Sequence, residues 1–168
     1  MDTQLILDRL KSNRYKFFAT ITGGGTGAIS RLLEQGGASS VFIGAEIPYG
    51  YDITETKPVK YVSESYAKEL AVHSMDKIYA ACPTLSDLDS TLGLGVSVAL
   101  TKKDERAERP NEACMCLAVD NAGSHCWQYI YRHLPIDKTV FQTRVAQEVY
   151  VEQRILQFLQ DFLLGSIQ

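Results

Sequence analysis

Residues 16–34 read KFFATIT, GGGTG and AISRLLE, an apolar run followed by a glycine-rich loop and an amphipathic segment. These patterns predict a strand, a loop and a helix in that order. In such a unit, backbone N–H groups and the positive end of the helix dipole can hold an anion. Three consecutive glycines cost backbone entropy on folding, so we expect that a side chain would be in the way there. The sequence therefore predicts a site at Gly23, Gly24, Gly25, Thr26 and Gly27.

Outward from this unit, the hydrophobic periodicity predicts the element order α-β-α-β-α-β-β-β-α. The early strands need helical crossovers and should be parallel, whereas a hairpin turn makes the last two antiparallel. We therefore predict an α/β fold, a three-layer α/β/α sandwich with a mixed five-stranded sheet, as a single domain over residues 1–168. The predicted helices span about 3–13, 26–35, 64–82 and 139–164, and the strands about 16–22, 41–45, 92–100, 113–119 and 125–131.

The composition, with 45% hydrophobic and 22% charged residues, is that of an ordinary globular domain. A formal net charge of −3 gives no overall basic footprint, so we expect no nucleic-acid partner. No apolar run reaches the roughly 18 residues that span a bilayer, and the first residues do not resemble a secretory signal. We expect a cytoplasmic protein with no membrane partner. The charged segment 101–111 is expected to be a solvated surface loop.

Neither the cysteines nor the histidines have the spacing of a metal site. We expect the cysteines to be reduced, buried thiols, and we expect no metal and no cofactor. The residues concerned are Cys82, Cys114, Cys116, Cys126, His73, His125 and His133.

The glycine loop is not a phosphate-binding P-loop, because no Gly-Lys-Ser/Thr follows. It has three other interpretations. The first is a dinucleotide-binding fingerprint, since Gly23, Gly25 and Ala28 satisfy its spacing and Glu46 lies near the expected acidic position. A second interpretation is a tight turn, without any ligand, where strand and helix pack closely. The third comes from a resemblance to a known family.

Three segments carry this resemblance: FATITGGG at 18–25, GASSVFIG at 37–44 and PYG at 48–50. They resemble the C-terminal domain of the competence/damage-inducible protein CinA, the nicotinamide-nucleotide amidase family. Its members carry Ala-Glu-Ser-Cys-Thr-Gly-Gly, then Gly-Ala-Ser, then Tyr-Ser-Asn-x-x-Lys. The segments VSE at 62–64 and LPIDK at 134–138 are similar to further family segments, so the likeness runs from about 16 to 160.

The resemblance implies a chemistry, because the family releases ammonia from nicotinamide mononucleotide with a Ser nucleophile, a Lys base and a Tyr partner. Aligned without a gap, this chain places Thr22 at the nucleophile and Tyr49 at the tyrosine. The family lysine corresponds to Thr54, so Lys57 or Lys60 would have to replace it through a rearranged loop.

Two hypotheses of function follow. A hydroxyl nucleophile without an adjacent base is poorly activated, which favours a non-catalytic or weakly active protein that binds a nucleotide-like small molecule at Gly23–Gly27. Tyr49 and Tyr51 would then form an aromatic wall for a ring, or else simply anchor their loop. The alternative is an amidohydrolase with Thr22 as nucleophile, Lys57 as base and Tyr49 as hydrogen-bonding partner. In either case we expect a homo-oligomer.

Overall fold

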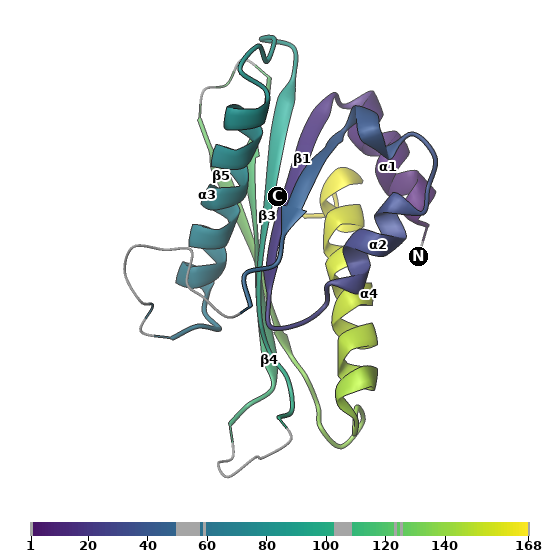
Figure 1. Ribbon diagram of the computed structural model, residues 1–168, viewed down its shortest axis with the longest axis vertical. Coiled ribbons are helices and arrows are strands. Elements are labelled where there is room, and N and C mark those ends of the chain that lie inside the picture. The colour runs from purple at the N-terminus through teal and green to yellow at the C-terminus, as the bar shows by residue number, and fades with distance from the viewer. Residues whose placement is uncertain are drawn as a thin grey trace.

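The computed structural model describes residues 2–49, 58, 60–102, 109–122, 124 and 126–167. Within them, the helices and strands follow one another in the predicted order, with one additional short 3-10 helix (Figure 1). The elements are α1 (Thr3–Ser12), β1 (Tyr15–Thr22), α2 (Gly27–Leu33), η1 (Ala38–Ser40), β2 (Phe42–Glu46), α3 (Glu64–Ala81), β3 (Ser90–Ala99), β4 (Glu112–Asp120), β5 (Gln128–Pro135) and α4 (Arg144–Leu163).

The five strands form one mixed sheet in the order β2-β1-β3-β4-β5. β1 is parallel to both β2 and β3, whereas β4 is antiparallel to β3 and β5. The predicted division into early parallel strands and a late antiparallel pair is therefore confirmed. Because β1, β2 and β3 run in the same direction, their carboxyl ends meet at one edge of the sheet, the carboxyl edge.

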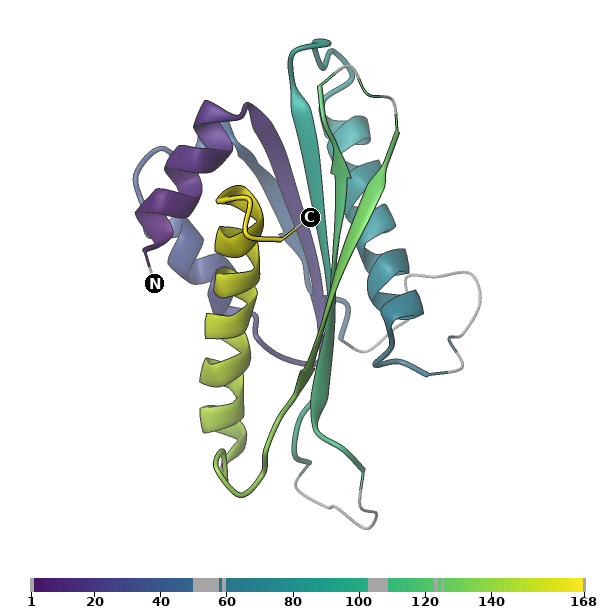
Figure 2. The same ribbon diagram turned by 180° about the vertical axis from the view of Figure 1, so that it is seen from behind.

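Helices cover both faces of this sheet, which confirms the three-layer sandwich. α3 lies on one face, and α1, α2 and α4 lie on the other (Figures 1 and 2). Each face has its own buried apolar cluster, the larger one beneath α1, α2 and α4. None of the described helices is both long enough and apolar enough to cross a bilayer.

Glycines let α3 lie directly on β3. A Cβ atom on Gly95 would overlap the carbonyl oxygen of Ala67, and one on Gly93 would lie 2.5 Å from the carbonyl oxygen of Ala71. Backbone thus packs against backbone at this crossing. The approach fixes the first turn of α3 over the end of β3, at the carboxyl edge.

The bounds of α4 and β5 differ most from the prediction. We expected the last helix from about residue 139, but Thr143 caps α4 by accepting a hydrogen bond from the N–H of Ala146. The Asp137 carboxylate instead holds a separate turn through the N–H and hydroxyl of Thr139, at 2.8 and 2.7 Å. β5 runs from Gln128 to Pro135, whereas the predicted strand ran from residue 125 to residue 131.

The described cysteines are all free thiols, but they are not all buried as expected. Cys114 and Cys116 are buried in β4, which agrees with the expectation. Cys82, which follows the last residue of α3, is half-buried, and Cys126, in the connection between β4 and β5, is exposed.

Candidate functional site

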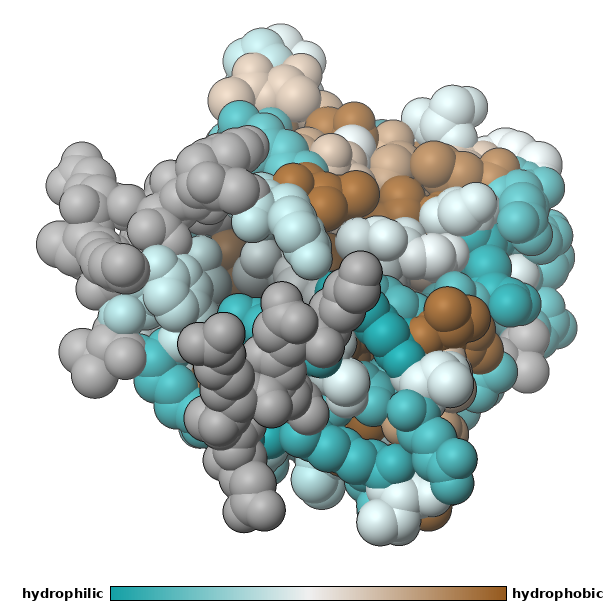
Figure 3. Space-filling view, turned by 60° about the horizontal axis from the view of Figure 1, so that its bottom comes forward, coloured by the Kyte–Doolittle hydropathy of each residue, from teal (hydrophilic) through white to brown (hydrophobic). Residues whose placement is uncertain are grey.

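A cavity of about 460 Å³ lies at the carboxyl edge of the sheet, the edge that faces the viewer in Figure 3. The ends of β1 and β3, the segment after β2, and the first turns of α3 and α4 converge on it. Cationic, tyrosyl, hydroxyl and apolar side chains share its wall. The lining consists of Thr22, Gly23, Pro48, Tyr49, Tyr61, Val62, Tyr66, Ser97, Val98, Ala99, Leu100, Lys102, Arg109 and Arg144.

Arg144, the first residue of α4, binds three other parts of the site. Its Nη2 donates to the carbonyl oxygen of Gly23 at 3.3 Å and to the Tyr49 hydroxyl at 3.4 Å. Its Nη1 donates to the carbonyl oxygen of Thr101 at 3.2 Å. The guanidinium therefore joins the glycine loop, the segment after β2 and the end of β3.

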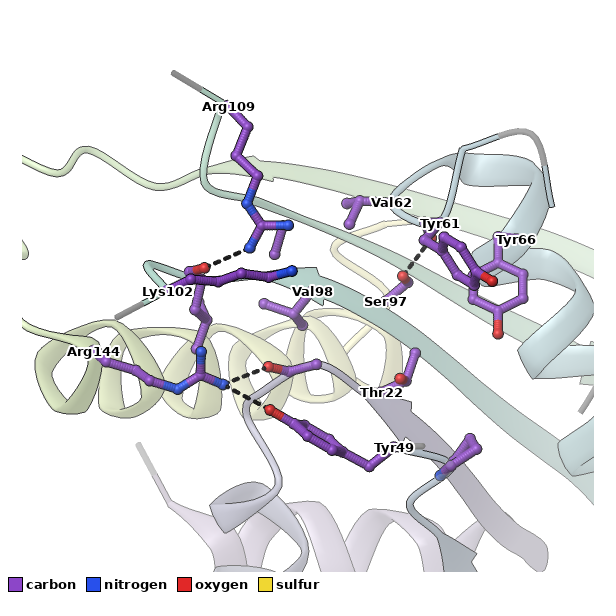
Figure 4. A pocket seen from close by; sticks show the side chains of 14 residues that line it. Thr22, Tyr49, Tyr61, Val62, Tyr66, Ser97, Val98, Lys102, Arg109 and Arg144 are labelled. Carbon is purple, nitrogen blue, oxygen red and sulfur yellow. Dashed lines mark hydrogen bonds between the residues drawn. The ribbon is translucent and has the colours of Figure 1, made fainter. Parts of the chain in front are cut away.

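Lys102 and Arg109 lie beside Arg144 and complete a cationic end of the pocket (Figure 4). Arg109 Nη2 donates to the carbonyl oxygen of Leu100 at 2.7 Å, while its Nε is buried and has no partner among the described residues. Lys102 is exposed and forms no ion pair within the described part of the chain. No described acidic side chain lines the cavity. Glu148 pairs with Arg144 at 3.7 Å, and the further charges of Lys102 and Arg109 leave this end positive, which suits an anion.

Tyrosines form the opposite end of the pocket. The rings of Tyr61 and Tyr66 meet edge to face, with centroids 5.5 Å apart and an angle of 88° between their planes. Ser97, which is buried, donates its hydroxyl hydrogen to the carbonyl oxygen of Tyr61 and so holds that segment against β3. Figure 4 shows Ser97, Val98 and Thr22 between the two ends.

Three of the predicted site residues, Thr22, Gly23 and Tyr49, come together in this pocket. Thr22 ends β1 and lies opposite Ser97 of β3 in the parallel register. Its hydroxyl makes no hydrogen bond to any described side chain that would serve as a base. Gly23 has a φ of 88°, and a Cβ atom there would overlap the carbonyl oxygen of Val98, so the turn after β1 requires glycine.

The remainder of the predicted loop lies against α4, outside the cavity lining. The N–H of Gly25 donates to the Glu148 carboxylate at 2.6 Å, and a Cβ atom on Gly24 would lie 3.1 Å from the same carboxylate. Gly27 faces Glu152, which pairs with Arg31. Thr26 precedes α2 without a capping side-chain bond.

Of the two lysines predicted as possible bases, Lys57 lies outside the described residues. Tyr51, predicted to bind the ligand, lies outside them as well. Lys60 is described, and its Nζ lies 2.8 Å from Oε1 of Glu112, whose Oε2 is 2.8 Å from His133 Nε2. The hydrogen bond to Glu112 raises the pKa of Lys60, so its amine is protonated at neutral pH and poorly suited to accept a proton.

Glu46, the acidic residue of the dinucleotide interpretation, is bound by α3. Its carboxylate oxygens lie 2.6 Å from Lys77 Nζ and 2.7 Å from His73 Nε2. The hydrogen bond from Lys77 is the main cause that lowers the pKa of Glu46, with a smaller contribution from His73. A ribose would have to compete with both partners for this carboxylate.

The cationic end was not predicted from the sequence. The segment with Lys102 and Arg109 was predicted to be a solvated loop, and no role was predicted for Arg144. The only local signal of these three residues is their charge, which is typical of exposed residues. They meet only because the β3–β4 connection and the first residue of α4 lie at the same edge of the sheet. No group of described His, Cys, Asp and Glu residues could hold a metal ion.

No family model matches the chain, and no curated protein matches it. Solved structures with a similar fold include the competence or damage-inducible protein from Enterobacter asburiae, at 15% identity and a TM-score of 0.65, over 97% of this chain and 94% of that one. A CinA superfamily protein from Enterobacter cloacae has 15% identity and a TM-score of 0.64, over 97% and 89%. A third, from Klebsiella pneumoniae, has 12% identity and a TM-score of 0.50, over 97% and 96%. The chain therefore has the fold of CinA superfamily proteins.

Proposed function

We propose that this protein binds a small anionic, nucleotide-like molecule in the cavity at the carboxyl edge. The observation that carries the proposal is the cationic end, where Lys102, Arg109 and Arg144 line the pocket and no described acidic side chain does. Guanidinium groups bind phosphate oxygens with paired, charge-assisted hydrogen bonds. A terminal phosphate is the anion that we assign to this end.

The tyrosine end suits the remainder of such a ligand. Tyr61 and Tyr66 offer aromatic surface, and Tyr49, held through its hydroxyl by Arg144, lies between the two ends. A pyridine or purine ring gains from stacking or edge contacts with tyrosine. The ligand would then lie across the ends of β1 and β3, with its phosphate toward α4.

We expect the ligand to lie beside Thr22 and Gly23, and not along the whole loop from Gly23 to Gly27. The N–H of Gly25 already donates to Glu148, and Gly24 and Gly27 face carboxylates of α4. A phosphate next to these carboxylates would be repelled. The pocket side of the loop has the opposite charge.

We propose that catalysis is absent or weak. Thr22 has no described base within hydrogen-bonding distance, and a hydroxyl with a pKa far above 7 needs one.

The second candidate function is hydrolysis of the amide of nicotinamide mononucleotide through Thr22. One observation favours it: Thr22 and Tyr49 line the same cavity, as the family resemblance implies. Ammonia release from nicotinamide mononucleotide, with a Thr22→Ala control, tests it. A release rate that Thr22→Ala leaves unchanged would reject Thr22 as the nucleophile.

Binding is tested by calorimetric titration with matched pairs of ligands. AMP and nicotinamide mononucleotide carry a phosphate, whereas adenosine and nicotinamide riboside carry the same rings without it. We expect the phosphorylated member of a pair to bind more tightly, and Arg109→Gln to remove most of the difference. Arg154→Gln, on the exposed side of α4, is the matched control. Equal affinity for AMP and adenosine would contradict the proposed role of the cationic end.

A further inference from the structure

A buried glutamine of α4 is bonded to the segment that carries two of the pocket's cations. We infer that Gln147 is a positioning residue for the cationic end, and its predicted effect on affinity rests on the proposed function. Gln147 is fully buried, with an exposed fraction of 0%. Fully buried amides are uncommon and persist where their hydrogen bonds are satisfied, so its partners indicate what it does.

One partner is the carbonyl oxygen of Phe141, just before α4, which accepts from Nε2 of Gln147 at 2.8 Å. The other partners belong to the two ends of segment 101–111. Oε1 of Gln147 accepts from the N–H of Thr101 at 3.0 Å, and its Nε2 donates to the Thr101 hydroxyl at 2.9 Å. The same Oε1 accepts from Nδ2 of Asn111 at 3.1 Å, and Asn111 also donates to the Thr101 hydroxyl at 2.7 Å. Gln147, Thr101 and Asn111 therefore join the end of β3, the start of β4 and α4.

Each cation is at most two residues or one hydrogen bond from this network. Lys102 follows Thr101, and Arg144 donates to the carbonyl oxygen of Thr101 at 3.2 Å. Arg109 precedes Asn111 by two residues and donates to the carbonyl oxygen of Leu100 at 2.7 Å. Two residues in the first turn of α4 thus hold Thr101 through both its backbone N–H and its carbonyl oxygen.

Cations whose backbone is held in place before a ligand arrives lose less conformational entropy when it binds. Without the Gln147 amide, the N–H of Thr101 and the amide of Asn111 lose a buried partner, which carries a cost in free energy. Thr101 and Asn111 would relax toward conformations in which water satisfies these groups. Lys102 and Arg109 would then have to be ordered by the ligand itself.

The test compares Gln147→Leu with Gln153→Leu, which changes an exposed glutamine of the same helix. The probe is AMP, titrated at a temperature at which circular dichroism shows each protein to be folded. We expect Gln147→Leu to weaken AMP binding about tenfold, the size expected when a buried neutral hydrogen-bonding group loses its partner, and Gln153→Leu to leave it unchanged. A merely structural role would lower the melting temperature and leave the affinity of the folded protein unchanged.

A double-mutant cycle shows whether Gln147 acts through the cations. In a background that carries Lys102→Gln and Arg109→Gln, the groups that Gln147 positions are gone. We therefore expect Gln147→Leu to change the logarithm of the AMP affinity by less than half as much as it does in the wild-type background. Full additivity would overturn the inference. Thr101→Val, which removes only the hydroxyl, is the milder variant to use if Gln147→Leu does not fold, and we expect it to weaken AMP binding in the same direction.

A measurement without ligand separates this inference from the proposed function. We expect the backbone N–H of Thr101, which donates to Gln147, to exchange with solvent at least tenfold faster in Gln147→Leu, while the backbone N–H groups of β1 keep their rates. An unchanged exchange rate at Thr101 would overturn the inference, whatever the affinities. If the wild-type protein binds neither AMP nor nicotinamide mononucleotide, the proposed function fails, and the exchange rates alone decide the role of Gln147.

Discussion

The carboxylate of Glu148 in α4 accepts a hydrogen bond from the backbone N–H of Gly25 at 2.6 Å. An acidic side chain of the protein itself thus lies beside the glycine loop, where the sequence pattern led us to expect an anionic ligand. The other oxygen of this carboxylate is 3.7 Å from Nη2 of Arg144. Glu148 therefore connects the loop to the pocket.

Removing this carboxylate should destabilise the fold. Glu148→Ala leaves the N–H of Gly25, in a buried part of the loop, without its charged acceptor, and we expect a loss of about 1 kcal/mol in the free energy of unfolding. Urea titration measures it. Glu69→Ala, an exposed glutamate of α3, is the control, and a loss no larger than that of the control would show that the bond contributes nothing.

Gly95 should tolerate no side chain. A Cβ atom there overlaps the backbone of α3 at Ala67, and backbone cannot move aside without moving the helix. We expect Gly95→Ala to cost at least about 3 kcal/mol of stability, or to prevent folding. Gly36→Ala is the matched control, because nothing lies within 4 Å of a Cβ atom at that position. Similar melting temperatures for the two variants would contradict the close packing of α3 on β3.

Lys102 should affect binding without affecting stability, because it is exposed and forms no ion pair in the described part of the chain. We expect Lys102→Gln to weaken AMP binding about two- to fivefold, the range of an exposed charge pair. The effect should shrink as salt is added, because salt screens exposed charges. Lys11→Gln, on α1, is the control. An effect of Lys102→Gln that is independent of salt would argue against a charge interaction.

Glu46 should make stability depend on pH in the acid range. Its folded pKa is lowered, chiefly by the hydrogen bond from Lys77, so its contribution is complete above the unfolded value of about 4.3 and is lost as the pH falls through the folded pKa. We expect Glu46→Gln to cost about 0.5 kcal/mol at pH 7 and nothing near pH 2. Unfolding titrations at both values check it, with Asp76→Asn on the exposed side of α3 as control. An equal cost at both pH values would exclude the ionised carboxylate as the cause.

The cysteines should differ in reactivity. Burial raises the pKa of Cys116 to about 12, so almost no thiolate is present at pH 8 and no reagent reaches it in the folded protein. Cys126 is exposed, and we expect it to give the fastest phase with a disulfide reagent. Cys126→Ser should remove that phase, while Cys116 reacts only after unfolding. Persistence of the fastest phase in Cys126→Ser would assign it to another thiol.

Much of the fold was predictable because its signals are local. Residues 16–34 specify a strand, a glycine turn and a helix, and similar periodicities specify the other elements and their order. The boundaries of β5 and α4 were predicted less well, since the cap at Thr143 and the turn at Asp137 depend on a few side-chain hydrogen bonds. Of the candidate site, the sequence indicated Thr22, Gly23 and Tyr49, all of which line the pocket.

The sequence by itself determined the strand–glycine–helix unit and the mixed sheet, because side-chain periodicity and turn chemistry act over a few neighbouring residues. The tertiary structure alone decided which side of the glycine loop is open to a ligand. Glu148 reaches Gly25 across 123 residues, and Lys102, Arg109 and Arg144 meet only at the edge where β3 ends and where β4 and α4 begin. Charge patterns along a chain do not show which charges will face one another, since that depends on how the layers pack.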